Sequence, residues 1–99
     1  MNTEATIAKQ AVHDKLESQI QLAEAKLHTL KVQAENSKAN AEIKAIADLF
    51  PKKQSIQRKL QDLKKSSGEA WNRAKADLET LIADFQKSVK RIESKAKAH

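Results

Sequence analysis

The sequence predicts an all-α fold, either an elongated antiparallel helical hairpin or a three-helix coiled-coil bundle with one long and two shorter helices. Three observations support this prediction. Ala, Glu, Lys, Leu and Arg make up 52 of the 99 residues, a composition typical of long helices and coiled coils. The chain has one Gly and one Pro, too few for the frequent turns of an all-β fold. Apolar residues recur every three or four positions, which is the helical period.

The first expected helix covers residues 3–49, which contain neither Gly nor Pro. Its main apolar stripe is formed by Val12, Leu16, Ile20, Ala23, Leu27, Leu30 and Ala34. A second stripe with Ile43 and Ile46 appears later, on another face, so the end of this helix should have more neighbours than its beginning. The stretch from Gln33 to Asn40 lacks large apolar side chains and is the weakest part of the expected helix.

A shorter helix is expected over residues 51–65, after Phe50-Pro51. Proline removes a backbone donor and disfavours helical geometry at the preceding residue, so the first helix should end near Leu49. We favour a chain reversal here, although the apolar spacing would also keep phase through a kink.

A third helix is expected over residues 67–96, completing a single helical domain over residues 1–99. Ser66 and Glu69 have the spacing of a capping box, and Gly68 lies between them. The residues expected to form the helix–helix interface are those of the apolar stripes: Val12, Leu16, Ile20, Leu27, Leu30, Ile43, Ile46, Leu60, Leu63, Trp71, Leu78, Leu81, Phe85 and Ile92.

The first functional hypothesis is a non-enzymatic interaction or structural protein that associates through its helices. In the hairpin, the seam from Leu16 to Leu30 would have few neighbours from its own chain at its early end. The expected partner is therefore a second copy of the chain or another helical protein. A thin helical coil offers no pocket with converging polar groups, so we expect neither an enzyme nor a small-molecule substrate.

The second hypothesis is a peripheral protein that binds an anionic membrane or lipid-granule surface. The net charge of +6 belongs to the second half of the chain, because residues 1–50 carry −1 and residues 51–99 carry +7. Candidate contacts to an anionic partner are Lys52, Lys53, Arg58, Lys59, Lys64, Lys65, Lys87, Lys90 and Arg91. Nucleic-acid binding is a weaker alternative, because few aromatic residues are interleaved with these charges.

No cofactor, metal site or catalytic residue is expected. The chain has no Cys, and His13, His28 and His99 form no pair with the spacing of a helical metal site. The N-terminal residues do not form a signal peptide and no apolar run is long enough to span a bilayer, so we expect a cytoplasmic protein.

The segment Ser67-Gly68-Glu69-Ala70-Trp71 resembles a motif of small bacterial coiled-coil proteins of about this length. In that group a long charged helix ends in a Ser-Gly-acidic-Ala-Trp motif, which a shorter amphipathic helix follows. Lys15-Leu16-Glu17 and the stretch from Leu60 to Lys65 also match, and the resemblance covers roughly residues 15–92. The chain departs from the group at Phe50-Pro51, which interrupts the helix, and at Ile82, where the group has a second Trp. The resemblance implies a helical fold and no particular activity.

Overall fold

The computed structural model describes the backbone of residues 3–97 and the side chains of residues 7–96, and all regular structure in these residues is helical. The four helices are α1 (Thr3–Ser37), α2 (Asn40–Ala47), α3 (Phe50–Lys65) and α4 (Gly68–Lys97). The molecule is elongated, with extents of 55 × 18 × 16 Å. α1 accounts for this length, since its 35 residues rise by about 52 Å. The expectation of an elongated all-α protein is confirmed.

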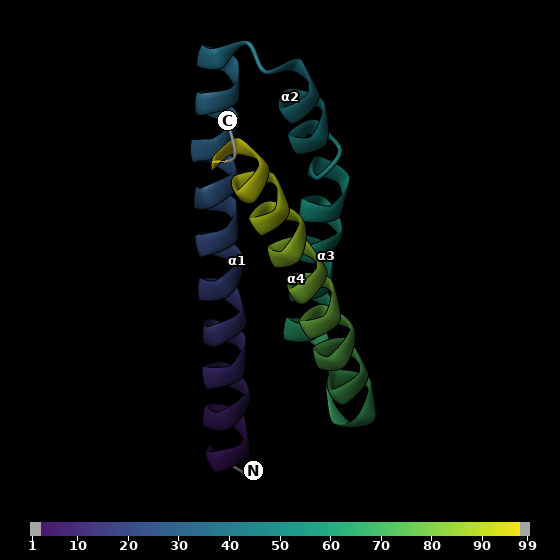
Figure 1. Cartoon of the computed structure of the whole chain (residues 1–99). Helices are drawn as coiled ribbons and strands as arrows, with labels where there is room; N and C mark the ends of the chain where they lie inside the picture. Colours follow the sequence, from purple (N-terminus) through teal and green to yellow (C-terminus); the bar gives the residue numbers. More distant parts are fainter. Residues whose placement is uncertain (1–2, 98–99) are drawn as a thin grey trace.

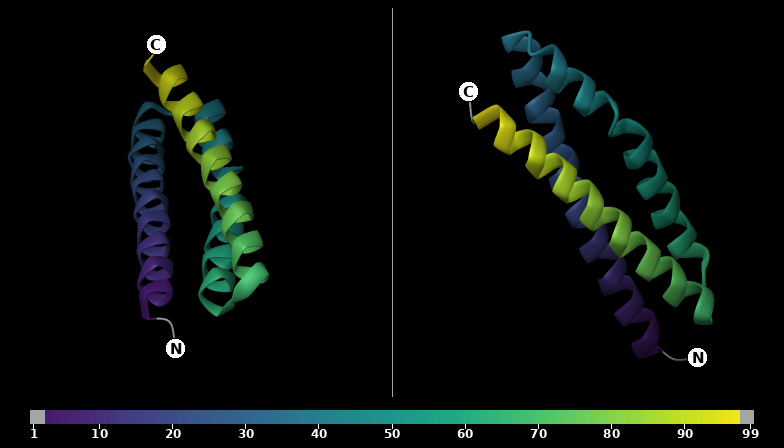
Figure 2. Two further views of the ribbon diagram at one scale, coloured as in Figure 1. Left: turned by 90° about the horizontal axis from the view of Figure 1, so that it is seen from below. Right: turned by 45° about the vertical axis from the view of Figure 1, so that its right-hand side comes forward.

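The helices form three adjacent helical segments, which we call legs: α1, then α2 with α3, then α4 (Figure 1). α2 and α3 run in the opposite direction to α1 and together form the second leg. α4 then runs in the same direction as α1 (Figure 2). α4 contacts α1, α2 and α3, and α1 also contacts both α2 and α3. Each leg therefore packs against the other two.

The single long helix expected over residues 3–49 is wrong, because the chain reverses after Ser37. Lys38 has a left-handed backbone with φ of 56°. Its N–H donates to the carbonyl of Glu35 at 3.2 Å, and the N–H of Ala39 donates to that of Ala34 at 2.9 Å. These two bonds are the Schellman pattern that ends a helix. The reversal lies in the stretch without large apolar side chains, and it brings Ile46 of α2 back onto the core.

We expect Lys38→Gly to raise the free energy of unfolding by about 0.5–1 kcal/mol. A left-handed conformation costs a non-glycine residue roughly 1–2 kcal/mol, and the greater freedom of glycine in the unfolded chain offsets part of this gain. Lys44→Gly is the matched control, since this exposed position inside α2 should lose about 1 kcal/mol. Urea denaturation measures both values. Equal losses in the two variants would place Lys38 inside a continuous helix.

Phe50-Pro51 marks a kink, so the chain reversal favoured at this position is wrong. Asp48 and Leu49 both keep right-handed helical geometry, with φ and ψ of −65° and −17° and of −86° and −13°. Pro51 lies in the first turn of α3, where a missing N–H breaks no helical bond. α2 and α3 consequently continue in the same general direction (Figure 1).

The turn between α3 and α4 does not use the expected capping box. The hydroxyl of Ser66 donates to the carbonyl of Asp62 at 2.6 Å, so it closes the end of α3. Glu69 pairs with Arg73 at 3.6 Å instead of reaching back to Ser66. Gly68 has φ of +60°, a conformation that glycine adopts without strain, and this allows the chain to reverse with only two residues between α3 and α4.

The hydrophobic core runs along the line where the three legs meet. Its largest fully buried side chains come from the second and third legs: Ile46, Ile56, Leu63, Leu78 and Phe85. α1 contributes Leu16, Ile20, Leu27 and Leu30 from the opposite side. None of the described helices is long and apolar enough to cross a membrane.

Candidate functional site

The seam from Leu16 to Leu30 is buried within one chain. Leu16, Ile20 and Leu27 are each 4–5% exposed, and they belong to the same core cluster as residues of α3 and α4. The expectation that this seam has few neighbours from its own chain at its early end is therefore wrong. The reason is the reversal at Lys38, after which α2, α3 and α4 all pack against α1. The buried seam is therefore not an exposed apolar surface.

The other expected interface residues all contribute to the same core, to different extents. Ile46, Leu63, Leu78, Phe85 and Ile92 are buried, whereas Val12, Ile43, Leu60, Trp71 and Leu81 are partly buried against the core. Buried core residues outside the predicted interface set are Ala23, Ala34, Leu49, Ile56, Ile82 and Val89. On α4 the series Leu78, Ile82, Phe85, Val89, Ile92 has steps of four and three, and this pattern in the sequence could have identified Ile82 in place of Leu81.

Trp71 lies at the start of α4 and is partly buried against the core. Two ammonium groups lie over its ring, Lys9 at 5.4 Å and Lys75 at 5.9 Å from the centroid. The cation–π contact with Lys9 ties the beginning of α4 to α1, whereas Lys75 lies one turn further along α4 itself. Trp71 therefore acts in this structure as a packing residue between two helices.

The basic residues of α3 do not form one surface. Arg58 and Lys65 each follow a buried residue, Ile56 or Leu63, by two positions and so face away from the core. Lys59 pairs with Asp77 of α4 at 3.7 Å, and Lys53 lines a small cleft against α1. Lys52 is exposed, and Lys64 lines a cavity on the α1 side. Their charges are thus spread around the helix.

The candidate basic residues of α4 gather near its end. Lys87, Arg91 and Lys95 are exposed and follow one another at four-residue spacing, with Lys90 beside them. Residues at this spacing lie above one another on a helix. We call these four residues the α4 basic stripe.

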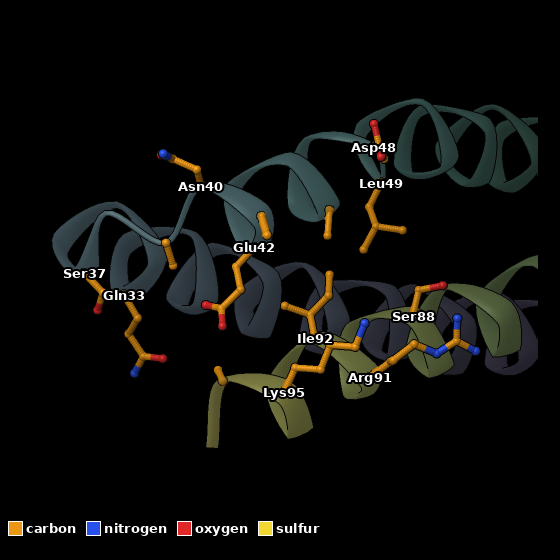
Figure 3. A pocket seen from close by; sticks show the side chains of 14 residues that line it. Gln33, Ser37, Asn40, Glu42, Asp48, Leu49, Ser88, Arg91, Ile92 and Lys95 are labelled. Atoms are coloured by element: carbon orange, nitrogen blue, oxygen red, sulfur yellow. The ribbon is translucent and has the colours of Figure 1, made fainter. Parts of the chain in front are cut away.

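A groove of about 1000 Å³ lies between the end of α1, α2 and the end of α4 (Figure 3). Much of its wall consists of small side chains: Ser37, Ala39, Ala41, Ala45, Ser88 and Ala96. Leu49 and Ile92 lie between the walls. Glu42 extends into the groove from α2, and Lys95 extends into it from α4, next to Arg91 (Figure 3). Two residues of the α4 basic stripe, Arg91 and Lys95, thus line the groove, opposite the acidic side chain of Glu42 on α2.

No family model matches the chain, and neither the curated proteins nor the solved structures contain a match. The resemblance based on Ser67–Trp71 therefore stays a prediction.

Proposed function

We propose that this protein is a non-enzymatic helical binding module that holds one amphipathic helix of a partner protein in the groove between α2 and α4. The groove is the observation that carries the proposal. Its volume of about 1000 Å³ is at the upper end of ordinary ligand pockets, and its walls are helices. A helix laid into a groove between helices is a common mode of peptide recognition.

The dimensions of the groove suit a short helix. α2 has 8 residues and is about 12 Å long, and the part of α4 from Ser88 to Ala96 has a similar length. A partner helix of about two to three turns would match both walls. Alanine and serine side chains on the walls allow its backbone to approach closely, since the distance between packed helices depends on the side chains at the contact.

The charges of the groove specify the flanks of the partner helix. Arg91 and Lys95 on the α4 side favour acidic residues, and the rest of the α4 basic stripe extends this field. Glu42 on the α2 side favours a basic residue on the other flank. The proposed partner is therefore an amphipathic helix with an apolar face, an acidic flank toward α4 and a basic flank toward α2.

We expect Ala45→Phe to weaken binding of such a helix at least about tenfold, because the new ring fills the groove. The probe is a synthetic amphipathic peptide of about 14 residues, with a leucine face, glutamates on one flank and lysines on the other. Ala47→Phe is the matched control, since Ala47 is exposed on the same helix and does not line the groove. Fluorescence anisotropy measures the affinity, and amide chemical shifts locate the peptide.

A charge-reversal pair tests the same site independently. The double variant Arg91→Glu/Lys95→Glu should bind the peptide more weakly. Added salt should weaken peptide binding to the unchanged protein. The double variant Arg58→Glu/Lys65→Glu, on the outer face of α3, should leave the peptide affinity unchanged. Binding that survives both Ala45→Phe and the α4 pair would contradict the proposal.

Two other partners would give different results. A second copy of the chain in the groove would raise the molar mass in sedimentation experiments, and Ala45→Phe would abolish the increase. If the α4 basic stripe binds an anionic lipid surface, the protein would bind anionic vesicles at low salt, and Ala45→Phe would bind them equally well. Either result would contradict the proposal of a partner helix and would identify a second copy of the chain or a lipid surface as the partner.

A further inference from the structure

His13 is a buried imidazole without a hydrogen-bond partner. It lies on α1, is 6% exposed and is the buried polar residue of the described core. Among the described residues neither Nδ1 nor Nε2 finds a hydrogen-bond partner. Leaving a buried polar group unsatisfied costs roughly 1–3 kcal/mol, so this side chain requires an explanation.

Two carboxylates lie beside the same ring nitrogen. Nδ1 of His13 is 3.6 Å from Oδ1 of Asp14 and 3.6 Å from Oε2 of Glu17. These distances are too long for good hydrogen bonds. They are close to the separation of about 3.3 Å between two ligand atoms around a tetrahedral ion with bonds of 2.0–2.1 Å. The three ligand atoms all lie within 4.8 Å of one another.

We propose that His13, Asp14 and Glu17 bind a divalent transition-metal ion of the zinc class. One imidazole nitrogen and two carboxylate oxygens are a donor set that such ions accept, and water would complete the coordination. Solvent reaches the site through the carboxylates, whose side chains are 64% and 44% exposed.

A glutamine amide lies within hydrogen-bond distance of each carboxylate. The amide of Gln10 donates to Oδ1 of Asp14 at 3.0 Å. The amide of Gln21 donates to Oε1 of Glu17 at 3.5 Å, which leaves Oε2 toward His13. Hydrogen bonds of this kind are the usual second layer around metal ligands.

The space beside the ligands accommodates an ion with water. A cavity of about 300 Å³ lies between α1 and α3 and is lined by His13 and Glu17 together with Gln57, Gln61 and Lys64. The ammonium of Lys64 opposes a cation there, so this residue limits the affinity. Replacing it should tighten binding, which an unfolded or damaged variant would not do.

The test is a calorimetric titration of the full chain with zinc chloride. We expect one ion per chain, at least about tenfold weaker binding in Glu17→Gln and His13→Leu, and binding a few times tighter in Lys64→Gln. The His28→Gln/His99→Gln double variant is the control, because it removes the other two histidines. Cobalt absorption spectra report the coordination geometry, and circular dichroism checks the fold of each variant.

Three outcomes would overturn the proposal. The first is the absence of zinc binding to the unchanged protein. The second is equal affinity in the unchanged protein, Glu17→Gln and His13→Leu. The third is loss of binding in the double variant, which would place the ion on His28 or His99.

Discussion

Phe85→Ala is expected to lower the free energy of unfolding by about 3–5 kcal/mol. Phe85 lies on α4, is 2% exposed and belongs to the largest fully buried side chains of the described core. Removing its ring leaves a cavity where the three legs meet, and neighbouring helices can close it only in part. Because a domain of this size has a total stability of about 5–15 kcal/mol, a large share would be lost. Urea denaturation followed by circular dichroism measures the change.

Phe50→Ala is the matched control for this loss. Phe50 is 40% exposed at the start of α3, with the ammonium of Lys31 5.6 Å from its ring centroid. Its side chain is only partly buried and its removal also deletes one cation–π contact, so we expect a loss of about 1–2 kcal/mol, well below that of Phe85→Ala. Equal losses in the two variants would show that α4 does not pack into the core through Phe85.

The helical periodicity of the sequence predicted most of the core but not the path of the chain. The stripe from Leu16 to Leu30 is buried as its spacing predicts, because a continuous apolar face must be covered by something. Periodicity does not say which segment covers it. A hairpin that reversed at Pro51 would have left the early seam bare, whereas a reversal at Lys38 covers it.

The lack of large apolar side chains from Gln33 to Asn40 marked the region as weak, but no local signal identified a chain reversal at Lys38. Helices that end in this way usually have Gly or Asn at the left-handed position, and this chain has Lys. The local cost of about 1–2 kcal/mol is outweighed by packing far away in the sequence, where Ile46 is buried to 1% exposure. Proline at residue 51 is the stronger local signal, yet it produces only a kink because its place in the first turn of α3 requires no N–H.

The two candidate sites differ in how far the sequence could have indicated them. His13 and Glu17 are four residues apart, so their proximity on a helix was predictable, although a search for paired histidines misses it. The groove depends on how α4 diverges from α2, which no local pattern encodes. Its small wall residues Ala41, Ala45 and Ala96 only become meaningful once the two helices are placed.

Leu27→Ala is expected to lower the free energy of unfolding by about 2–4 kcal/mol, with a thermal midpoint that does not depend on protein concentration. Leu27 is 4% exposed in the middle of the α1 seam. Because its neighbours belong to the same chain, dilution does not remove them. An intermolecular seam would behave differently, since its midpoint would rise with concentration by mass action.

The measurement compares melting curves of the unchanged protein and of Leu27→Ala over about a hundredfold range of concentration. Leu22→Ala is the matched control, because Leu22 lies on the same helix and is 65% exposed. We expect its loss to stay within about 0.5 kcal/mol. A midpoint of the unchanged protein that rises with concentration, together with a Leu27→Ala variant that abolishes the rise, would return the seam to a second copy of the chain. Such a result would also contradict the packing of α1 against α3 and α4, because one apolar face cannot be buried against its own chain and against a partner at the same time.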